Sequence, residues 1–566
     1  MGRLGSILCT ALLPAAWFGC AAAPPPASGP GGGAGSGLGG AITGQGGAGG
    51  GRGAVTFAIR SDTSVHPISP FIYGLNSTQE IATTRQTVVR LGGNRWTAYN
   101  WENNASNAGA DWHYQNDGYL VQGMANPDAP GEAVRNVLQT SHANGAAALL
   151  TVPNVDYVSA DKKEDGDVRG AAAGSPDAGT AYLQTRFKLN QAKRGSAFSL
   201  TPDVSDGFVY QDEFVNWVKT NFSDGPVLFD LDNEPDIWSD THPEVHPAPV
   251  TYAELVERNR RFAGAIKDTW PDAKVLGFVS YGWNGFTTLQ DAPDAKANGD
   301  FINYYLDSMS AQSATAGTRL IDYLDLHWYP EAKGGSDAAG NGGTRITGAD
   351  TTDAVVEARV QAPRSLWDPN YTEVSWITKG SSAGPIRLIP RMKEKIAARY
   401  PGTELAFSEW NYGGGTHISG GIATADVLGI LGREGVALAC NWDLLTDQVF
   451  MRAAIRAYRN FDGAGGHFGD TSIEASTSDV EASSVYASVD STAPDRMVIV
   501  AINKRIYPLT ATIQVAHTMS YSQADVFTLT ASAPAVTAVP GLSASTANQF
   551  VYTMPAQSVS VIVPKL

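Results

Sequence analysis

Phe229-Asp-Leu-Asp-Asn-Glu-Pro235 is a short apolar run that ends in a carboxylate, and Glu404-Leu-Ala-Phe-Ser-Glu-Trp-Asn-Tyr-Gly413 has the same form far downstream. Each run delivers a glutamate, Glu234 or Glu409, beside an asparagine or a tryptophan. This pattern is typical of a buried parallel strand whose C-terminal end places a carboxylate in a cleft. The two stretches therefore predict an α/β fold with acidic side chains at two strand ends.

Further β-rich runs of the same kind alternate with helical stretches from residue 71 onward. Eight runs are found, at 71–76, 88–93, 146–154, 226–234, 274–281, 321–330, 404–413 and 435–444. Between them apolar residues recur at helical spacing, for example over 252–270. Eight strand–helix units in succession predict a (β/α)8 TIM barrel, whose active site lies at the C-terminal strand ends. Glu234 and Glu409 then fall on the fourth and seventh strands.

The apolar period changes to two after about residue 470. Apolar and polar residues alternate over 497–503, 510–516, 525–529, 550–553 and 558–563, with turn residues between these segments. This pattern predicts a C-terminal antiparallel β-sandwich. The strand-like segment 54–59 is expected to join it, because an isolated edge strand would leave backbone groups unpaired. The predicted domains are a joining segment at 54–70, the catalytic barrel at 71–465 and the sandwich at 466–566.

The N-terminal segment 1–20 is typical of an export signal. Arg3 precedes an apolar stretch at 4–18 that is too short to span a bilayer stably. Trp17-Phe-Gly-Cys20 resembles a lipoprotein cleavage box, which would make Cys20 a lipidated first residue; simple secretion with cleavage nearby is the alternative. Residues 21–53, rich in Gly, Pro and Ala, are predicted to form a disordered linker. We expect a secreted or cell-surface protein, with an outer-membrane lipoprotein as one form.

The composition excludes several kinds of partner. A formal net charge of -16 disfavours nucleic acid and anionic membrane surfaces, because both bind basic faces. Membrane contact is then expected only through a lipid anchor on Cys20, and we expect a monomer. Once the export signal with Cys9 is removed, Cys440 is the cysteine left in the folded part, so no intramolecular disulfide can form there. The 13 Trp and 21 Tyr offer flat aromatic surface for stacking on sugar rings.

The paired glutamates suit glycoside hydrolysis. In that reaction one carboxyl group donates a proton to the leaving oxygen, and an ionised one attacks or steadies an oxocarbenium-like centre. The alternative is that Glu234 and Glu409 are ordinary solvated or salt-bridged strand-end carboxylates. Pro235, which ends the strand, and the neighbouring Trp, Tyr and Asn side chains favour the catalytic interpretation for the pair.

Five blocks of this sequence resemble glycoside hydrolase family 44. They are Arg90-Leu-Gly-Gly-Asn-Arg-Trp at the start of 90–109, Asp232-Asn-Glu-Pro-Asp-Ile-Trp238, Asp325-Leu-His-Trp-Tyr-Pro330, Arg364-Ser-Leu-Trp-Asp-Pro369 and Ser408-Glu-Trp-Asn-Tyr-Gly413. The resemblance extends from about residue 54 to the end. It implies a retaining endo-β-1,4-glucanase that often accepts xyloglucan, built as a barrel joined to a β-sandwich. It also implies that Glu234 is the acid/base and Glu409 the nucleophile.

Other residues near the strand ends are candidates for support of this pair. We expect a raised pKa for Glu234, with ionised Glu409 as one cause. Asn233 can donate its amide to the sugar 2-hydroxyl, or alternatively satisfy backbone groups. Tyr329 can hydrogen-bond Glu409, and His327 can orient this region, or else be a satisfied core histidine.

Aromatic and polar residues on other strands are candidates for sugar subsites. Trp442 is placed where its ring can form the floor of the subsite beneath the scissile sugar, with core packing as the alternative. Arg90 and Asn94, on or just after the second strand, can support the nucleophile or contact sugar. The looser candidates for neighbouring subsites, each with a structural role as the alternative, are Trp101, Trp112, Trp367 and Trp376.

We expect no cofactor in catalysis and assign no metal ligands. The resemblance leaves room for a structural calcium ion whose ligands the sequence does not identify. Two functional alternatives stay open. One is an endo-β-1,4-mannanase or xylanase, because the same pair can cleave any equatorial β-1,4 link. The other is a non-catalytic surface glycan-binding lipoprotein.

Overall fold

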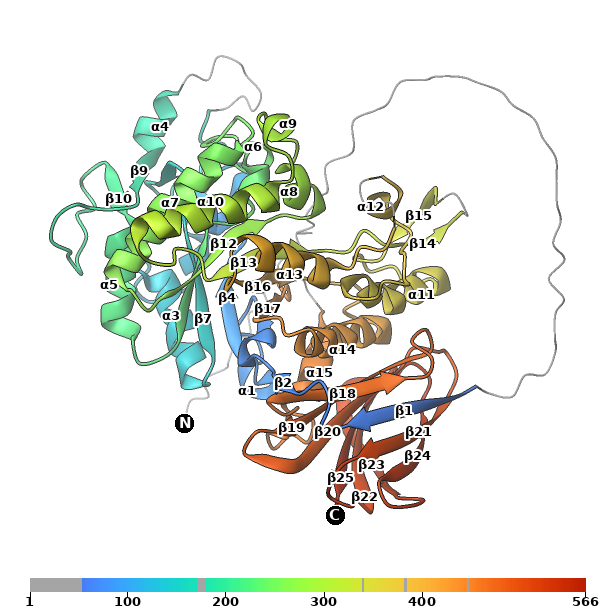
Figure 1. Cartoon of the computed structure of the whole chain (residues 1–566). Coiled ribbons are helices and arrows are strands. Elements are labelled where there is room, and N and C mark those ends of the chain that lie inside the picture. Colours follow the sequence, from blue (N-terminus) through green and yellow to red (C-terminus); the bar gives the residue numbers. More distant parts are fainter. Residues whose placement is uncertain (1–52, 171–179, 338–339, 381–383, 445–446) are drawn as a thin grey trace, which may run out of the picture. The chain divides into compact units, whose positions relative to one another are not determined.

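The computed structural model describes residues 53–170, 180–337, 340–380, 384–444 and 447–566. Eight parallel strands close into a barrel within this part of the chain. In chain order they are β3 (Gly74–Leu75), β4 (Val88–Leu91), β7 (Ala147–Val152), β11 (Val227–Leu231), β12 (Lys274–Ser280), β13 (Tyr323–Trp328), β16 (Glu404–Trp410) and β17 (Leu438–Asn441). Each lies within one of the eight predicted runs, so the predicted TIM barrel is confirmed (Figure 1).

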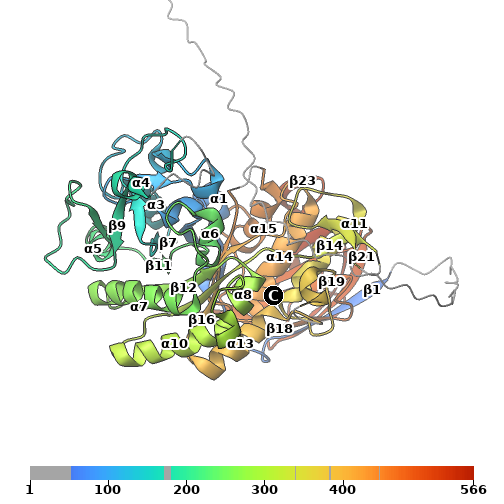
Figure 2. The ribbon, with the colours of Figure 1, turned by 90° about the horizontal axis from the view of Figure 1, so that it is seen from above.

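A helix follows each barrel strand before the next one begins. These helices are α1 (Ile81–Thr84), α3 (Glu132–Ala143), α5 (Gln211–Phe222), α7 (Tyr252–Thr269), α10 (Phe301–Ala316), α13 (Leu388–Arg399), α14 (Ile418–Arg433) and α15 (Val449–Arg459). Their apolar faces cover strands such as β7 and β11, in which every residue is buried. Seen from above, α7, α10 and α13 lie along one side of the barrel and α3 and α5 along another (Figure 2). Among the described residues, no helix has the length and apolar composition that a membrane span requires.

Two long βα connections carry secondary structure of their own. After β7, the strands β8 (Tyr157–Ser159), β9 (Phe187–Gln191) and β10 (Phe208–Tyr210) form a small sheet. After β13, the hairpin β14 (Lys333–Ser336) and β15 (Gly342–Arg345) precedes α11 (Asp353–Gln361) and α12 (Trp376–Lys379). Loops at the C-terminal strand ends of a TIM barrel form its binding surface.

The C-terminal part forms a second sheet around a core of its own. Its strands are β18 (Thr471–Thr477), β19 (Ser483–Asp490), β20 (Ala493–Asn503), β21 (Leu509–Ala516), β22 (Gln523–Thr530), β23 (Ala533–Ser543), β24 (Gln549–Met554) and β25 (Ser558–Lys565). The period-two pattern is plain in β21, where alternate residues from Leu509 to Val515 are buried. β1 (Ala54–Arg60) lies between β18 and β21, antiparallel to the first and parallel to the second (Figure 1). The predicted export signal and most of the predicted linker lie outside the described residues.

The sandwich packs against α14 and α15 of the barrel. Alternate residues of β20 face two different cores: Val498, Val500 and Ile502 join the barrel core, and Met497, Ile499 and Ala501 the sandwich core. A buried ion pair crosses this junction, because Lys504 Nζ lies 2.8 Å from Asp426 Oδ2 on α14, with both side chains 1% exposed. Tyr486 also donates a hydrogen bond to Asp426 Oδ1 at 2.6 Å.

The substitution Lys504→Met is expected to lower the thermal unfolding temperature clearly, because it leaves the buried carboxylate of Asp426 without its cation. Removing one partner of a buried pair costs about 3–5 kcal/mol. Lys565→Met is the matched control, since its ion pair with Asp525 is about half exposed, and exposed pairs contribute about 0–1 kcal/mol. Calorimetry of both variants tests this; equal melting temperatures would contradict a stabilising role for the junction pair.

Candidate active site

Glu234 is presented by the strand end of β11 in a constrained backbone conformation. Its φ of 46° and ψ of 53° lie in the left-handed region, which costs a non-glycine residue free energy and concentrates at functional sites. The Glu234 amide donates to the carbonyl of Val279 at 2.9 Å. Just before it, Asp232 Oδ2 accepts from the amide of Asn154 at 2.6 Å, which ties this turn to the loop after β7. Pro235 then begins a short 3-10 helix that ends the strand.

Glu409 lies on β16 at an irregularity of the barrel. The pairing of β16 with β17 shifts register between Phe407 and Trp410. Both oxygens of the Glu409 carboxylate receive a donor: Arg90 Nη1 donates to Oε1 at 2.6 Å, and the Tyr329 hydroxyl donates to Oε2 at 2.7 Å. The predicted contact of Tyr329 with Glu409, and the predicted support from Arg90, are therefore present.

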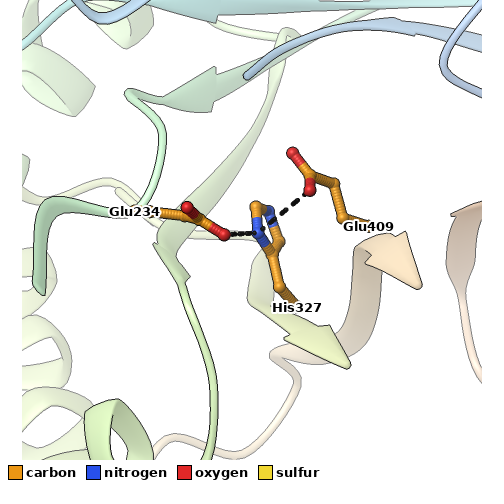
Figure 3. A group of neighbouring side chains, drawn as sticks. All are labelled: Glu234, His327 and Glu409. Carbon is orange, nitrogen blue, oxygen red and sulfur yellow. Dashed lines mark hydrogen bonds and ion pairs between the residues drawn. The ribbon is translucent and has the colours of Figure 1, made fainter. Parts of the chain in front are cut away.

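The two glutamates face each other across His327 (Figure 3). His327 Nδ1 lies 2.8 Å from Glu234 Oε1 and 3.5 Å from Glu409 Oε2. One oxygen of each carboxylate and one ring nitrogen all lie within 4.8 Å of one another. Carboxyl groups about 5–5.5 Å apart are typical of retaining glycosidases, whereas inverting enzymes keep them about 6.5–9.5 Å apart. The arrangement therefore suits double displacement.

The pKa of Glu234 is raised to about 8, and the sequence predicts a shift in this direction. The main cause is burial; the charge of Arg90 lowers this pKa and the carboxylate of Asp111 raises it. The contribution expected from ionised Glu409 stays a prediction. Burial also lowers the pKa of His327 to about 3, with Glu409 opposing and Arg90 reinforcing the shift, so the imidazole is neutral at physiological pH.

Arg90 is the centre of the polar network inside the barrel mouth. Its side chain is fully buried and donates to Asp230 at 2.8 Å and to Asn233 Oδ1 at 3.0 Å, besides Glu409. Burial by itself lowers the pKa of Arg90, but Asp230 and Glu409 together raise it above its ordinary value. Arg90 thus supplies a permanent positive charge beside Glu409.

The side-chain oxygen of Asn233 is held by two hydrogen-bond donors. Oδ1 accepts from Arg90 Nη2 and, at 3.1 Å, from the amide of Gly93. Gly93 has a φ of +98°, and a Cβ there would lie 2.9 Å from the ring of Trp442. The half-buried Trp442 ring therefore lies directly beside this turn, next to the network that holds Asn233 and Glu409. The side-chain nitrogen Nδ2 of Asn233 takes part in neither of these bonds, so it can donate to another group.

The remaining sequence candidates divide into three groups. Trp112 and Trp376 are 44% and 42% exposed and so available to a ligand. The Nδ2 of Asn94 already donates to Asp111 at 2.8 Å. The prediction that Trp101 lines a subsite is wrong: it is 1% exposed, packs against Phe214 and donates to the carbonyl of Tyr210.

The prediction that Trp367 lines a sugar subsite is also wrong. The guanidinium of Arg433 lies 4.1 Å from the centre of its ring. Arg433 is the last residue of α14, which runs back from the C-terminal end of β16 toward the start of β17. This contact therefore lies at the N-terminal side of the barrel, opposite the glutamates, and Trp367 has a structural role.

Several polar residues of the site were missed by sequence reasoning. Asp230 and Asp325 stand inside buried strands, and Ser408 directly precedes Glu409. The signal that could have found the two aspartates is a titratable side chain at alternate positions of an otherwise apolar strand, as in Asp325 and His327. Inward-facing residues of a barrel strand recur with period two.

The chemistry of the cluster is that of paired carboxylates. Glu234, His327 and Glu409 are also a possible metal-ligand triad among the described residues, but calcium prefers oxygen ligands only, and His327 supplies nitrogen. Two facing carboxyl groups, one buried with a raised pKa and one held by an arginine and a tyrosine, need no cofactor to cleave a glycosidic bond.

Comparisons with known proteins agree with this geometry. Residues 105–332 match the model of glycoside hydrolase family 44. Endoglucanase A of Paenibacillus lautus is 41% identical over 529 residues, which cover 90% of this chain and 72% of the relative. The chain belongs to glycoside hydrolase family 44. It is thus a glycoside hydrolase, and the resemblance inferred from the five sequence blocks is confirmed.

Solved structures of family 44 share this architecture. The structure of a Paenibacillus polymyxa xyloglucanase of family 44 with xyloglucan superposes with a TM-score of 0.84 at 38% identity, covering 90% of this chain and 99% of that one. A beta-mannanase/endoglucanase A of Caldicellulosiruptor saccharolyticus is 39% identical over 88% of this chain, which spans 38% of that longer protein.

Proposed function

We propose that this family 44 enzyme is a retaining endo-β-1,4-glucanase that hydrolyses xyloglucan and other soluble or amorphous β-glucans. The observation that carries the proposal is the pair of facing carboxylates, Glu234 and Glu409, with oxygens within 4.8 Å. Only Glu409 receives both an arginine and a tyrosine donor, which suits the ionised partner. Glu234, with its raised pKa, suits the protonated one.

The reaction follows from these two states. Glu409 Oε attacks the anomeric carbon while Glu234 gives its proton to the glycosidic oxygen, so the C–O bond breaks and a glycosyl ester of Glu409 forms. Glu234, now ionised, takes a proton from water; the water oxygen attacks the anomeric carbon and releases Glu409. Asn233 is proposed to donate its amide to the sugar 2-hydroxyl, a bond that strengthens at the transition state.

The substrate is proposed from the relatives and from the aromatic residues near the mouth. Two of the relatives are named as endoglucanases and one as a xyloglucanase with xyloglucan. The alternative of a mannanase or xylanase is less favoured, since the relative named as a mannanase is also named an endoglucanase. We propose Trp442, Trp112 and Trp376 as sugar-stacking residues. Export, the lipid anchor on Cys20, a structural calcium ion and the monomeric state stay predictions from the sequence.

One experiment tests both specificity and stereochemistry. Purified enzyme is assayed for reducing ends on xyloglucan, carboxymethylcellulose, mannan and xylan, and proton NMR follows the first-formed anomer. We expect the highest activity on xyloglucan or carboxymethylcellulose, with newly released β-anomer. Newly released α-anomer would contradict double displacement, and a preference for mannan or xylan would contradict the proposed substrate.

A further inference from the structure

The turn that carries Glu234 has a backbone conformation that residues with side chains rarely adopt. Asp232 and Glu234 have φ angles of 70° and 46°, both in the left-handed region. Such conformations cost free energy and persist only where the surrounding structure imposes them. From this turn the carboxyl group of Glu234 points toward His327 (Figure 3). The position of the proposed acid therefore depends on the groups that hold the turn.

On one side, the side chain of Asp232 joins the turn to the end of β7. This side chain is 0% exposed. Its Oδ2 accepts from the amides of Asn154 at 2.6 Å and Val155 at 3.2 Å, which follow β7 in the chain. Its Oδ1 accepts from the amide of Asn233, within the turn, at 2.8 Å. One carboxylate thus bonds to the turn and to a neighbouring strand end at the same time.

On the other side, Asp236 joins the turn to the end of β12. Its side chain is buried, its Oδ1 accepts from the amide of Tyr281 at 3.0 Å, and its Oδ2 accepts from the hydroxyl of Ser280 at 3.0 Å. The amide of Glu234 adds a bond to the carbonyl of Val279 on the same strand. Since β7 and β12 are the two neighbours of β11 in the barrel, the turn is held from both flanks.

The surroundings of Asp236 leave its carboxylate little room to move. A Cβ at position 285 would overlap Asp236 Oδ2 and Ser280 Oγ, so the glycine at this position allows the close approach. Burying a carboxylate is costly unless its oxygens accept hydrogen bonds, and each such bond also fixes a direction. Asp232 and Asp236, two residues before and two after Glu234, therefore determine where the segment between them lies.

We propose that Asp232 and Asp236 are positioning residues that fix the turn to β7 and β12 and thereby hold the carboxyl group of Glu234 at the glycosidic oxygen. The inference rests on the proposed role of Glu234 as the acid. Neither aspartate takes or gives the transferred proton. Because a misplacement of about 1 Å can cost about 10²-fold in rate, loss of either contact should weaken proton donation specifically.

The test compares kcat/KM on xyloglucan with kcat/KM on a dinitrophenyl cello-oligosaccharide. The dinitrophenyl group departs without a proton, so only the xyloglucan reaction needs Glu234 in place. The substitution Asp236→Ala is expected to lower kcat/KM on xyloglucan by about 10–100-fold and on the dinitrophenyl substrate by no more than about threefold. A merely structural role would lower both values equally and leave their ratio unchanged.

Two asparagine variants separate geometry from charge. Asp236→Asn keeps an oxygen for the amide of Tyr281 and gains an NH₂ group that can donate to Ser280 Oγ, so its ratio should stay within about threefold of wild type. Asp232→Asn has one oxygen where backbone amides donate to two, so one amide is left facing an NH₂ group. We expect this isosteric variant to show the selective loss on xyloglucan, and it decides the case if Asp236→Ala does not fold.

The matched control is Asp322→Ala. Asp322 is also a buried aspartate that accepts from a backbone amide, that of Val275 at 3.0 Å, but at the start of β12, the end opposite Ser280. It also pairs with Lys267 at 2.7 Å, so its loss should lower the thermal unfolding temperature. The ratio of the two kcat/KM values should nevertheless stay that of wild type.

An unchanged ratio in Asp232→Asn, or in a folded Asp236→Ala, would overturn the proposal. The variant Glu234→Gln, measured in the same assay, separates this failure from that of the proposed function. If Glu234→Gln shows the selective loss and the aspartate variants do not, the positioning role alone is refuted. If Glu234→Gln lacks the selective loss, the assignment of the acid fails, and the positioning role fails with it.

Discussion

The substitution Glu409→Gln is expected to lower kcat on xyloglucan by about 10⁴-fold or more, while substrate binding changes little. The amide keeps the size of the carboxylate but cannot form the glycosyl ester, and loss of a covalent nucleophile has effects of this order. Binding persists because the aromatic subsites are untouched. Steady-state kinetics measure the first effect and calorimetric titration with a xyloglucan oligosaccharide the second.

The same strand supplies a control for this variant. Glu404 lies at the exposed start of β16, at the end of the barrel opposite Glu409. Glu404→Gln makes the same chemical change and should leave kcat within about twofold, as expected for a surface substitution. Near-normal activity of Glu409→Gln would show that another group is the nucleophile.

The substitution Glu234→Gln is expected to lower kcat/KM on polysaccharide by about 10²–10⁴-fold, the usual contribution of general acid catalysis. The loss should be much smaller on an aryl glycoside with a good leaving group, because that group departs without a proton. Wild-type kcat/KM should fall as pH rises through about 8, where Glu234 loses its proton. This basic limb should be absent from the variant.

The pH profile also discriminates between the buried titrating groups. His327, with a pKa lowered to about 3, cannot give a limb near 8. If Glu234→Gln retained the basic limb of the wild type, the acid would have to be another residue. A variant with equal losses on polysaccharide and aryl glycoside would likewise argue against the proton-donor role.

Much of the fold could be predicted because its patterns are local. Each barrel strand is a short apolar run, and a run such as 226–234 ends at a proline, so the eight strands were found in order. The strands β18, β19 and β23 were missed. β23 is mostly exposed, and its sequence Ala533–Ser543 has no clear alternation. Its place depends on pairing with β22, which no local pattern records.

The site could be predicted only in part, for a related reason. Glu234, Glu409 and Arg90 stand at strand ends or beside glycines, where the sequence marks them. The contact of Ser408 with Asp325 depends on a shift of register between β13 and β16, a property of two strands about 80 residues apart. The burial of Trp101 similarly depends on α5, and its side chain type alone suggested a sugar contact.

The most direct test of the paired-carboxylate mechanism is to trap the covalent intermediate. A 2-deoxy-2-fluoro cello-oligosaccharide with a good leaving group slows hydrolysis of the glycosyl ester, and mass spectrometry of proteolytic peptides then locates the sugar. We predict a single label on Glu409, in the peptide that contains Ser408 and Trp410. A label on Glu234 or any other residue, or inactivation with no covalent label at all, would contradict the account.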